Sequence, residues 1–448
     1  MKKLLLLAAF VTTPCLSQDL THPLEMDFPD SDYQRPDPVE SQLALDNGLV
    51  AYVAKADQVP LVTMSAFIRG GLVSDEKQGA AESLQDALQN SGPSGMSSSD
   101  FQSSLRQMAA DFVVEMHDEW TEIRLNVPAE DLDRALPIFA GLLRQPAISD
   151  ANIERAAKSV APVAGFDMAA AVERFSAIIY KDHPYGMRPT TDDFKNLQVK
   201  DVADFHAKYF VPGNMTIAVA GAINAQEIRG RLVDLFGDWD EADVPDVKQM
   251  PAVTRSKATL HHTPSNKLHS WMVIGLDLPP LPLEDQAALD VMNYILGAEH
   301  LKTRLMVETR YKYGYTNDAS VFVEDHWYGP GAYTIRSYSR PEVIENIYQN
   351  MMGELVRIRS EEVTGQELFI ARGALADGEF PVRYLDGYAL ARSFALERLR
   401  YGNHERSASY VQRVRAVSED DVVDVARKYL RPDIMQVVLF GEEAFELD

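Results

Sequence analysis

Apolar and polar residues follow helix and strand periods along most of the chain. Helical spacing, such as Leu84 and Leu88 at i and i+4, alternates with short apolar runs that end at turn residues. The pattern predicts these elements: a hairpin over Leu43 to Val53 around Asp46-Asn47-Gly48; strands over 62–68, 121–127 and 270–276; and helices over 79–90, 98–110, 131–143, 150–181, 283–296 and 341–360. Strands and helices mix without strict βαβ alternation, which predicts the α+β class.

One segment occurs twice. Residues 201–221 and 421–441 align without a gap at an offset of 220. The identical pairs are Asp201/Asp421, Val202/Val422, Asp204/Asp424, Lys208/Lys428, Tyr209/Tyr429, Pro212/Pro432, Met215/Met435 and Gly221/Gly441. Each copy, called the repeat unit below, predicts a helix ending at the tyrosine, a break at the proline and then a strand. Because the offset is about half of the 448 residues, we infer a duplicated domain.

Composition and length divide the chain further. A single core stops growing at about 250–300 residues, so the length also indicates two domains. The predicted organisation is a signal peptide at 1–17, an extended lead-in at 18–38, a first domain at 39–237, an acidic linker at 238–256 and a second domain at 257–448. The linker is rich in Asp and Glu, lacks a basic residue at its acidic start, and contains Pro245 and Pro251.

The N-terminus has the pattern of a secretion signal. Lys2 and Lys3 precede the apolar run from Leu4 to Val11, and cleavage is expected after Ser17. The run is too short to span a bilayer, and no later segment qualifies as a span. The expected location is the periplasm. The alternative is a lipid anchor on Cys15, although Thr12-Thr13-Pro14 match poorly the small residues that precede such a cysteine.

The chain carries a formal net charge of −24. Such a field repels phosphate backbones, so nucleic acid is not an expected partner. Solubility outside the cytoplasm accounts for the charge, and the alternative is attraction of basic peptides.

Several short motifs accompany the repeat unit. They are Asn47-Gly48-Leu49, Glu154-Arg155, His183-Pro184-Tyr185-Gly186, and Thr303-Arg304-Leu305 followed by Arg310 and Gly314. Together with the repeat unit they resemble the pitrilysin/insulinase family of zinc peptidases, which includes the mitochondrial processing peptidase. The resemblance covers nearly the whole mature chain. It implies two tandem homologous α+β domains, each a mostly antiparallel sheet covered by helices.

The family's chemistry needs H-x-x-E-H on a helix, where two histidines bind zinc and the glutamate acts as general base. The segment aligned with that motif places Glu82 and Asp86 at the histidine positions and Gln85 at the base. A glutamine cannot take a proton at neutral pH. The third ligand position falls near Ala161 or Pro162. The resemblance therefore implies no metal, no cofactor and no catalysis by this chain alone, with zinc only in a partner.

Two other groups of side chains resemble metal ligands less closely. Glu82 and Asp86 share a helix face and could hold a hard cation, but two carboxylates alone make a weak site. His261, His262 and His269 lack zinc-ligand spacing and are interpreted as solvated loop residues. The sequence contains no G-x-S-x-G, phosphate-loop or dinucleotide motif.

The resemblance also implies a partner, because family members of this size often work as pairs of a zinc-bearing and a zinc-free subunit. In bacterial pairs the zinc-free subunit supplies an Arg and, seven residues later, a Tyr that bind substrate. Here Arg310 fills the first position, Asn317 the second, and Tyr315 stands two residues earlier. The alternatives are a surface ion pair for Arg310 and simple packing for Tyr315.

These observations predict a non-catalytic subunit of a periplasmic zinc-peptidase heterodimer. It would complete the peptide-binding chamber of an H-x-x-E-H partner and bind peptide by strand addition to a sheet edge. Two alternatives stay open, a purely structural scaffold and a self-sufficient enzyme with an unrecognised site.

Overall fold

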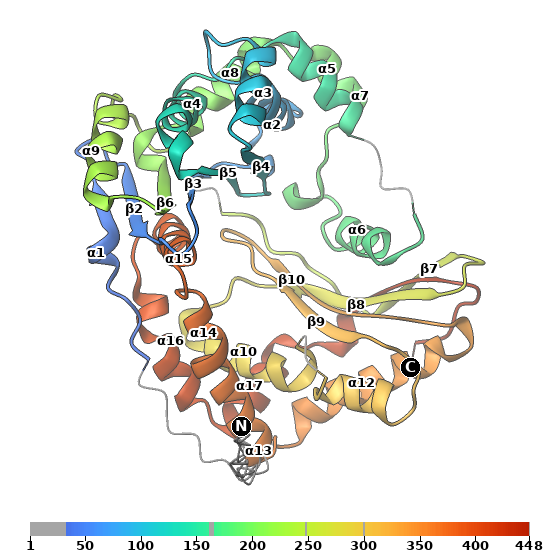
Figure 1. Cartoon of the computed structure of the whole chain (residues 1–448). Coiled ribbons are helices and arrows are strands. Elements are labelled where there is room, and N and C mark those ends of the chain that lie inside the picture. Colours follow the sequence, from blue (N-terminus) through green and yellow to red (C-terminus); the bar gives the residue numbers. More distant parts are fainter. Residues whose placement is uncertain (1–32, 161–164, 247–248, 299–300, 448) are drawn as a thin grey trace, which may run out of the picture. The chain divides into compact units, whose positions relative to one another are not determined.

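Two β-sheets form the framework of the molecule. The computed structural model describes residues 33–160, 165–246, 249–298 and 301–447. The first sheet has the order β1-β2-β6-β3-β5-β4 and the second β7-β11-β8-β10-β9 (Figure 1). The strands are β1 (Gln42–Ala44), β2 (Val50–Lys55), β3 (Leu61–Arg69), β4 (Asp111–Met116), β5 (Trp120–Pro128), β6 (Met215–Gly221), β7 (Thr259–Pro264), β8 (Ser270–Leu278), β9 (Ala319–Glu324), β10 (Gly331–Ser339) and β11 (Gln436–Gly441).

The two sheets share one topology. In the first sheet β2 and β6 are parallel, and in the second β7 and β11 are parallel. All other strand pairs in both sheets are antiparallel, so β2, β3, β4, β5 and β6 correspond to β7, β8, β9, β10 and β11. The predicted α+β class with two mostly antiparallel sheets is confirmed, and β1 is an addition to the first sheet.

Helices cover the sheets. They are α1 (Pro38–Ser41), α2 (Ala80–Asn90), α3 (Ser98–Gln107), α4 (Leu132–Arg144), α5 (Asp150–Ser159), α6 (Met168–Ile179), α7 (Thr191–Asn196), α8 (Val199–Tyr209), α9 (Ala225–Phe236), α10 (Leu283–Gly297), α11 (Arg304–Met306), α12 (Ile344–Ser360), α13 (Gly365–Gly373), α14 (Phe380–Val382), α15 (Gly387–Tyr401), α16 (Glu405–Ala416) and α17 (Glu419–Tyr429). Across the described part of the chain, every helix is too short or too polar to cross a membrane.

Most predicted elements lie where the pattern placed them. The hairpin, the strands over 62–68, 121–127 and 270–276, and the helices over 79–90 and 283–296 match to within a few residues. The single helical region predicted over 150–181 is wrong, because Asp167 is a non-helical N-cap and α5 and α6 are separate helices. Strands β4, β7, β9 and β10 and helices α13–α16 have no counterpart among the predicted elements.

The repeat unit is a structural device in both copies. The Asp201 carboxylate accepts from the Gln198 N–H at 2.9 Å, and Asp421 accepts from the Ser418 N–H at 2.7 Å, so both close the first turn of their helix. Pro212 and Pro432 each begin a 3₁₀ turn that ends the helix. The identical positions thus define where α8 and α17 start and stop.

The lysine and tyrosine of the repeat unit fasten each helix to a neighbouring segment. Lys208 pairs with Glu76 at 2.5 Å, and Lys428 pairs with Asp285 in the second copy. The Tyr209 hydroxyl donates to the Ser74 carbonyl at 3.1 Å, whereas Tyr429 donates to Asp285. These contacts give the repeated residues a structural role.

Each half sends one helix onto the sheet of the other half. Helix α15 packs on β2, β3 and β6, and α6 packs on β8 and β11 (Figure 1). The two helices match at an offset of 219: Asp167 and Asp386 are their N-caps, and Phe175 and Phe394 are both fully buried. The exchange therefore belongs to the duplicated plan, and residues 35–448 form one compact unit.

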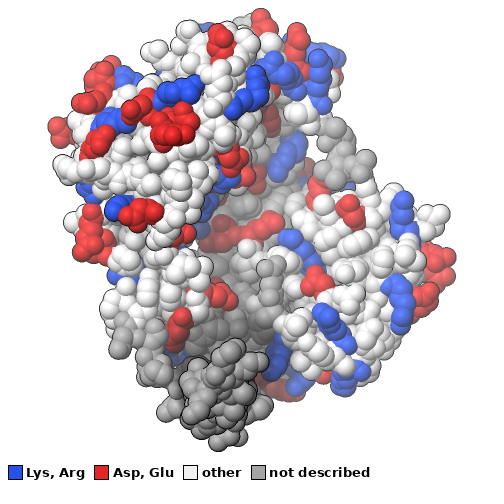
Figure 2. Space-filling model, viewed as in Figure 1, with Lys and Arg blue, Asp and Glu red and all other residues white. Residues whose placement is uncertain are grey.

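The predicted domain boundaries stay predictions. The acidic segment 238–256 lies between α9 and β7, and its residues 247–248 fall outside the described chain. The predicted signal peptide, Cys15 and most of the lead-in also lie outside the described residues. On the face drawn in Figure 2, Lys and Arg side chains are interspersed with Asp and Glu.

Candidate functional site

The segment aligned with H-x-x-E-H lies on helix α2. The helix begins after Gly79, whose φ of 98° is left-handed and whose Cβ, if present, would lie 2.8 Å from the Phe194 ring. Its apolar face, formed by Ala80, Ala81, Leu84, Ala87 and Leu88, is buried in the core between the sheet and the neighbouring helices. Because the helix repeats about every 3.6 residues, Glu82, Gln85 and Asp86 lie on a different and more polar side of the helix.

Asp86 is part of a polar joint between α2 and α5. Arg155 donates to its carboxylate from Nε at 3.1 Å and from Nη2 at 2.8 Å, and the fully buried Asn152 donates from Nδ2 at 2.8 Å. Asn90 adds a fourth donor at 2.9 Å. Both carboxylate oxygens are thus occupied by donors, which makes Asp86 a structural residue.

Gln85 turns toward the edge strand of the first sheet. Its Nε2 donates to the Val114 carbonyl at 3.1 Å. One turn later, Gln89 Nε2 donates to the Phe112 carbonyl at 3.2 Å, and Gln89 Oε1 accepts from the Val114 N–H at 2.8 Å. The residue at the general-base position therefore serves as a hydrogen-bond donor to main chain.

Glu82 has a buried carboxyl oxygen that lacks a hydrogen-bond partner among the described residues. The pKa of its carboxyl is raised to about 7, chiefly by burial and also by the nearby Asp75, while a main-chain hydrogen bond and Arg188 oppose the rise. Its Oε2 is buried and accepts no hydrogen bond from the described residues. A carboxyl held this way favours the protonated form and is a poor ligand for a cation.

These side chains do not fit zinc. The two histidine positions hold one engaged carboxylate and one carboxyl that resists ionisation, and the base position holds an amide that faces Val114. The predicted third position, Ala161 or Pro162, lies outside the described residues. Within the described residues, no three His, Cys, Asp or Glu side chains converge as metal ligands. The chain's own metal content stays a prediction.

Two of the suspected histidines belong to a strand, so their interpretation as loop residues is wrong. His261 Nε2 lies 3.0 Å from Gln436 Oε1, and His262 Nε2 lies 3.0 Å from the Gly441 carbonyl, both across the β7–β11 pair. The Nε2 atom of each histidine is therefore within hydrogen-bond distance of an acceptor on or beside the paired strand β11.

The predicted substrate-binding residues lie on the turn before β9. Arg310 Nη1 donates to the Asn317 carbonyl at 3.1 Å, so the structure brings these two together through main chain. Among the described residues Arg310 has no ion-pair partner, and its role as a substrate contact or as a surface residue stays a prediction. Tyr315 stacks on Tyr313 with ring centroids 5.1 Å apart. No described hydrogen bond links this turn to α2.

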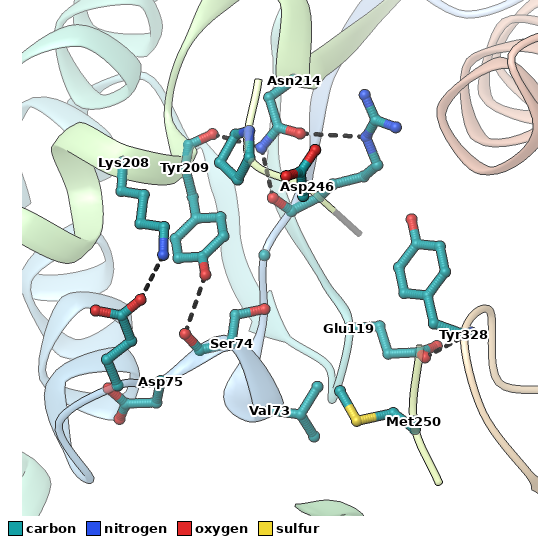
Figure 3. A pocket seen from close by; sticks show the side chains of 14 residues that line it. Val73, Ser74, Asp75, Glu119, Lys208, Tyr209, Asn214, Asp246, Met250 and Tyr328 are labelled. Carbon is teal, nitrogen blue, oxygen red and sulfur yellow. Dashed lines mark hydrogen bonds and ion pairs between the residues drawn. The ribbon is translucent and has the colours of Figure 1, made fainter. Parts of the chain in front are cut away.

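A separate cavity of about 300 Å³ was missed by sequence reasoning (Figure 3). Its wall includes Glu119, whose carboxylate accepts from the Tyr185 hydroxyl at 2.5 Å and from the Trp327 and Tyr328 N–H groups. Asn214 fixes Arg69 on the opposite wall, with Nε to Oδ1 at 3.1 Å. None of the predicted site residues lines this cavity. The residues that line the cavity are up to 259 positions apart in the sequence, so no local motif predicts it.

Comparison with known proteins gives matches in sequence. Residues 196–375 match the family described as Peptidase M16 inactive domain. The zinc protease PqqE of Helicobacter pylori is 29% identical over 130 residues, which are 28% of this chain and 29% of that protein. The uncharacterized zinc protease ML0855 of Mycobacterium leprae is 23% identical over 269 residues, 58% of each chain. The chain thus matches less than two thirds of these relatives' lengths.

Solved structures share the fold. A peptidase M16 inactive domain from Pseudomonas fluorescens superimposes with a TM-score of 0.77 at 18% identity, covering 90% of this chain and 98% of that one. A Helicobacter pylori protease gives 0.73 at 18% identity, with 89% and 98% covered. The periplasmic protease PqqL from Escherichia coli gives 0.71 at 15% identity, with 98% of this chain but 49% of PqqL covered.

The sheet order, the motif positions on α2 and the sequence match over residues 196–375 agree. Residues 196–375 therefore match the M16 inactive-domain family, and the described chain has the fold of the solved M16 structures.

Proposed function

We propose that this chain is the non-catalytic subunit of an M16 zinc-peptidase heterodimer and completes the peptide chamber of an H-x-x-E-H partner. The observation that carries the proposal is the use of the motif positions inside the chain: Asp86 is bound by Arg155 and Asn152, and Gln85 by Val114. In this proposal the chain retains the M16 fold and the walls of the chamber. The residues aligned with the catalytic motif make internal contacts and do not bind metal.

The partial overlap with PqqL supports a paired assembly. This chain aligns along 98% of its own length with only 49% of PqqL. Two chains of this size would together provide the span that PqqL holds in one polypeptide. PqqL is described as a periplasmic protease, and a signal peptide at residues 1–17 would deliver this chain to the same compartment.

Arg310 is the proposed substrate contact. Its guanidinium uses one nitrogen on the Asn317 carbonyl, which holds the side chain at the start of β9 and leaves the others for a peptide carbonyl or carboxylate. Asn317 is exposed and keeps an amide donor where the resemblance places a tyrosine hydroxyl.

Reconstitution tests the proposal. The purified chain is expected to bind no stoichiometric zinc and to cleave no unstructured peptide, whereas mixing it with a secreted M16 chain that carries H-x-x-E-H yields peptidase activity. Metal analysis, size-exclusion chromatography and cleavage of a quenched fluorescent peptide measure these three properties. Equal activity of the zinc-bearing chain with and without this one would contradict the proposal, as would chelator-resistant cleavage by this chain alone.

The second candidate is a scaffold subunit without substrate contact, which the missing tyrosine at position 317 favours. Arg310→Ala separates the two. Loss of turnover with intact assembly supports substrate contact, and unchanged turnover supports the scaffold. The exposed Arg340→Ala provides a matched control for loss of one surface guanidinium.

A further inference from the structure

We infer that the β4 edge of the first sheet is closed to strand addition by helix α2. Gln85 and Gln89 of α2 occupy three main-chain groups in the middle of the outer edge of β4, so that an extended peptide is excluded from this edge. The inference rests on the proposed function only in naming a peptide as the excluded ligand.

Strand β4 is one of the two edge strands of the first sheet, and among the described strands it pairs with β5 alone. An edge strand presents unpaired N–H and C=O groups, which other strands readily bind. Here the Val114 N–H bonds to Gln89 Oε1 at 2.8 Å, and the Val114 carbonyl bonds to Gln85 Nε2 at 3.1 Å. Both main-chain groups that Val114 directs away from β5 are therefore taken.

Gln89 imitates one residue of an added strand. A residue in a parallel strand donates to the carbonyl before, and accepts from the N–H after, the residue that it faces. The Gln89 amide donates to the Phe112 carbonyl at 3.2 Å and accepts from the Val114 N–H, on either side of Val113. A side-chain amide can do this because it carries both a donor and an acceptor.

The second half lacks this arrangement. Strands β4 and β9 correspond at an offset of 208, and the same offset places the buried Leu84 and Leu88 on the buried Met292 and Leu296. It also places Gln89 on Gly297, which has no side chain, and Gln85 on Asn293, which instead accepts from the Tyr333 hydroxyl at 2.9 Å. The closure is therefore a property of α2 and not of the fold.

The same geometry accounts for glutamine at the lost base position. A glutamate at position 85 would set a carboxylate oxygen against the Val114 carbonyl, which offers no proton. In the proposed heterodimer, the peptide's main chain must therefore pair with a strand other than β4 of this subunit.

Opening the edge tests the inference. The ligand is a fluorescein-labelled 12-residue peptide of alternating Val and Thr, and the readouts are fluorescence anisotropy and amide hydrogen exchange over residues 111–116. In Gln85→Ala/Gln89→Ala we expect binding at least about tenfold tighter than in the unsubstituted chain, with peptide-dependent protection of Val114, because main-chain pairing drives strand addition. Without peptide, the Val114 amide should exchange at least about fivefold faster in the variant, since one hydrogen bond is lost.

Two controls keep the result interpretable. Gln107→Ala removes an exposed glutamine from α3 and should leave both readouts unchanged. An oligoproline of the same length has no main-chain N–H donor and should not bind the open edge. Equal binding by the unsubstituted chain and the folded double variant, or no binding by that folded variant, overturns the inference. Thermal unfolding establishes folding, and Gln89→Glu, which keeps the acceptor and loses the donor, supplies a second variant. Because the test uses the isolated chain, its failure is distinct from a failure of partner activation.

Discussion

The two halves share one sheet topology. They differ in the helix next to the edge strand, which is α2 beside β4 in the first half and α10 beside β9 in the second. Helices α2 and α10 both bury an apolar face, and each carries a carboxyl at the same position, Glu82 and Asp290. Burial raises the pKa of Glu82 to about 7 and that of Asp290 to about 6. Asp290 accepts from the Tyr410 hydroxyl at 2.9 Å, whereas Glu82 keeps an unbonded oxygen. The duplicated residues maintain the shared topology of the two halves, and the residues that differ lie on α2 and α10.

The exchanged helices offer the strongest test of equivalence. Phe394 of α15 and Phe175 of α6 are both fully buried against the sheet of the other half. We expect Phe394→Ala and Phe175→Ala each to lower the free energy of unfolding by about 3–5 kcal/mol, since each deletes a buried aromatic side chain. Urea unfolding followed by circular dichroism measures both. A cost below about 1 kcal/mol for one of them would show that the exchange is not symmetric.

The glycine that ends each repeat unit should respond unequally. Gly221 has a φ of 149°, and a Cβ there would lie 2.1 Å from the Leu61 carbonyl oxygen, which cannot move away. At Gly441 the contact would be 2.7 Å from the Ser270 hydroxyl oxygen, a side-chain atom. We expect Gly221→Ala to cost about 3 kcal/mol and Gly441→Ala about 1 kcal/mol, in the range of overpacked cores. Thermal unfolding compares them, and equal costs would contradict the difference.

The unbonded carboxyl of Glu82 should make stability depend on pH. Its pKa in the folded chain lies above the ordinary value of 4.5, so folding favours the protonated form. This contribution is complete below about pH 4 and is lost as the pH rises to about 7. Glu82→Gln should remove the dependence and stabilise the chain at pH 8 by about 1–2 kcal/mol, allowing for solvent screening.

Unfolding at pH 5 and pH 8 checks this prediction. Asp290→Asn is the counterpart, and its smaller gain at pH 8 is expected because the Tyr410 hydroxyl already stabilises the carboxylate. An unchanged pH slope in Glu82→Gln would place the titrating group elsewhere.

Sequence reasoning predicted the parts of the fold that local patterns determine. The repeat unit, the hairpin at Asn47-Gly48 and the apolar face of α2 follow from turn chemistry and periodicity. The exchange of α6 and α15 could not be predicted, because an amphipathic helix shows which face it buries but not against which sheet. Strand β7 escaped because its half-exposed residues, including His261 and His262, lack an alternating pattern.

The site shows the same limit. The loss of H-x-x-E-H is visible in the sequence, and so is the position of each replacement. The hydrogen-bond partners of these side chains are not visible in the sequence, because Arg155 lies 69 residues from Asp86 and Val114 lies 25 residues from Gln89. Gln89 has no role in the family motif, and only the packing of α2 beside β4 reveals its contacts.

The helix caps of the two repeat units give the smallest expected effect. Ser418 Oγ accepts from the Asp421 N–H at 3.2 Å, whereas at Gln198 the Asp201 N–H meets only the Gln198 carbonyl. Ser418→Ala should therefore cost about 1 kcal/mol, and Gln198→Ala should stay within about 0.5 kcal/mol. Both capping residues have extended backbones, so a serine at 198 can reach the Asp201 N–H. Gln198→Ser should stabilise the chain by about 0.5–1 kcal/mol, measured by urea unfolding. If Gln198→Ser gives no gain, the backbone before α8 does not allow the cap that Ser418 makes before α17. The two halves would then differ in their repeat units as well as in α2.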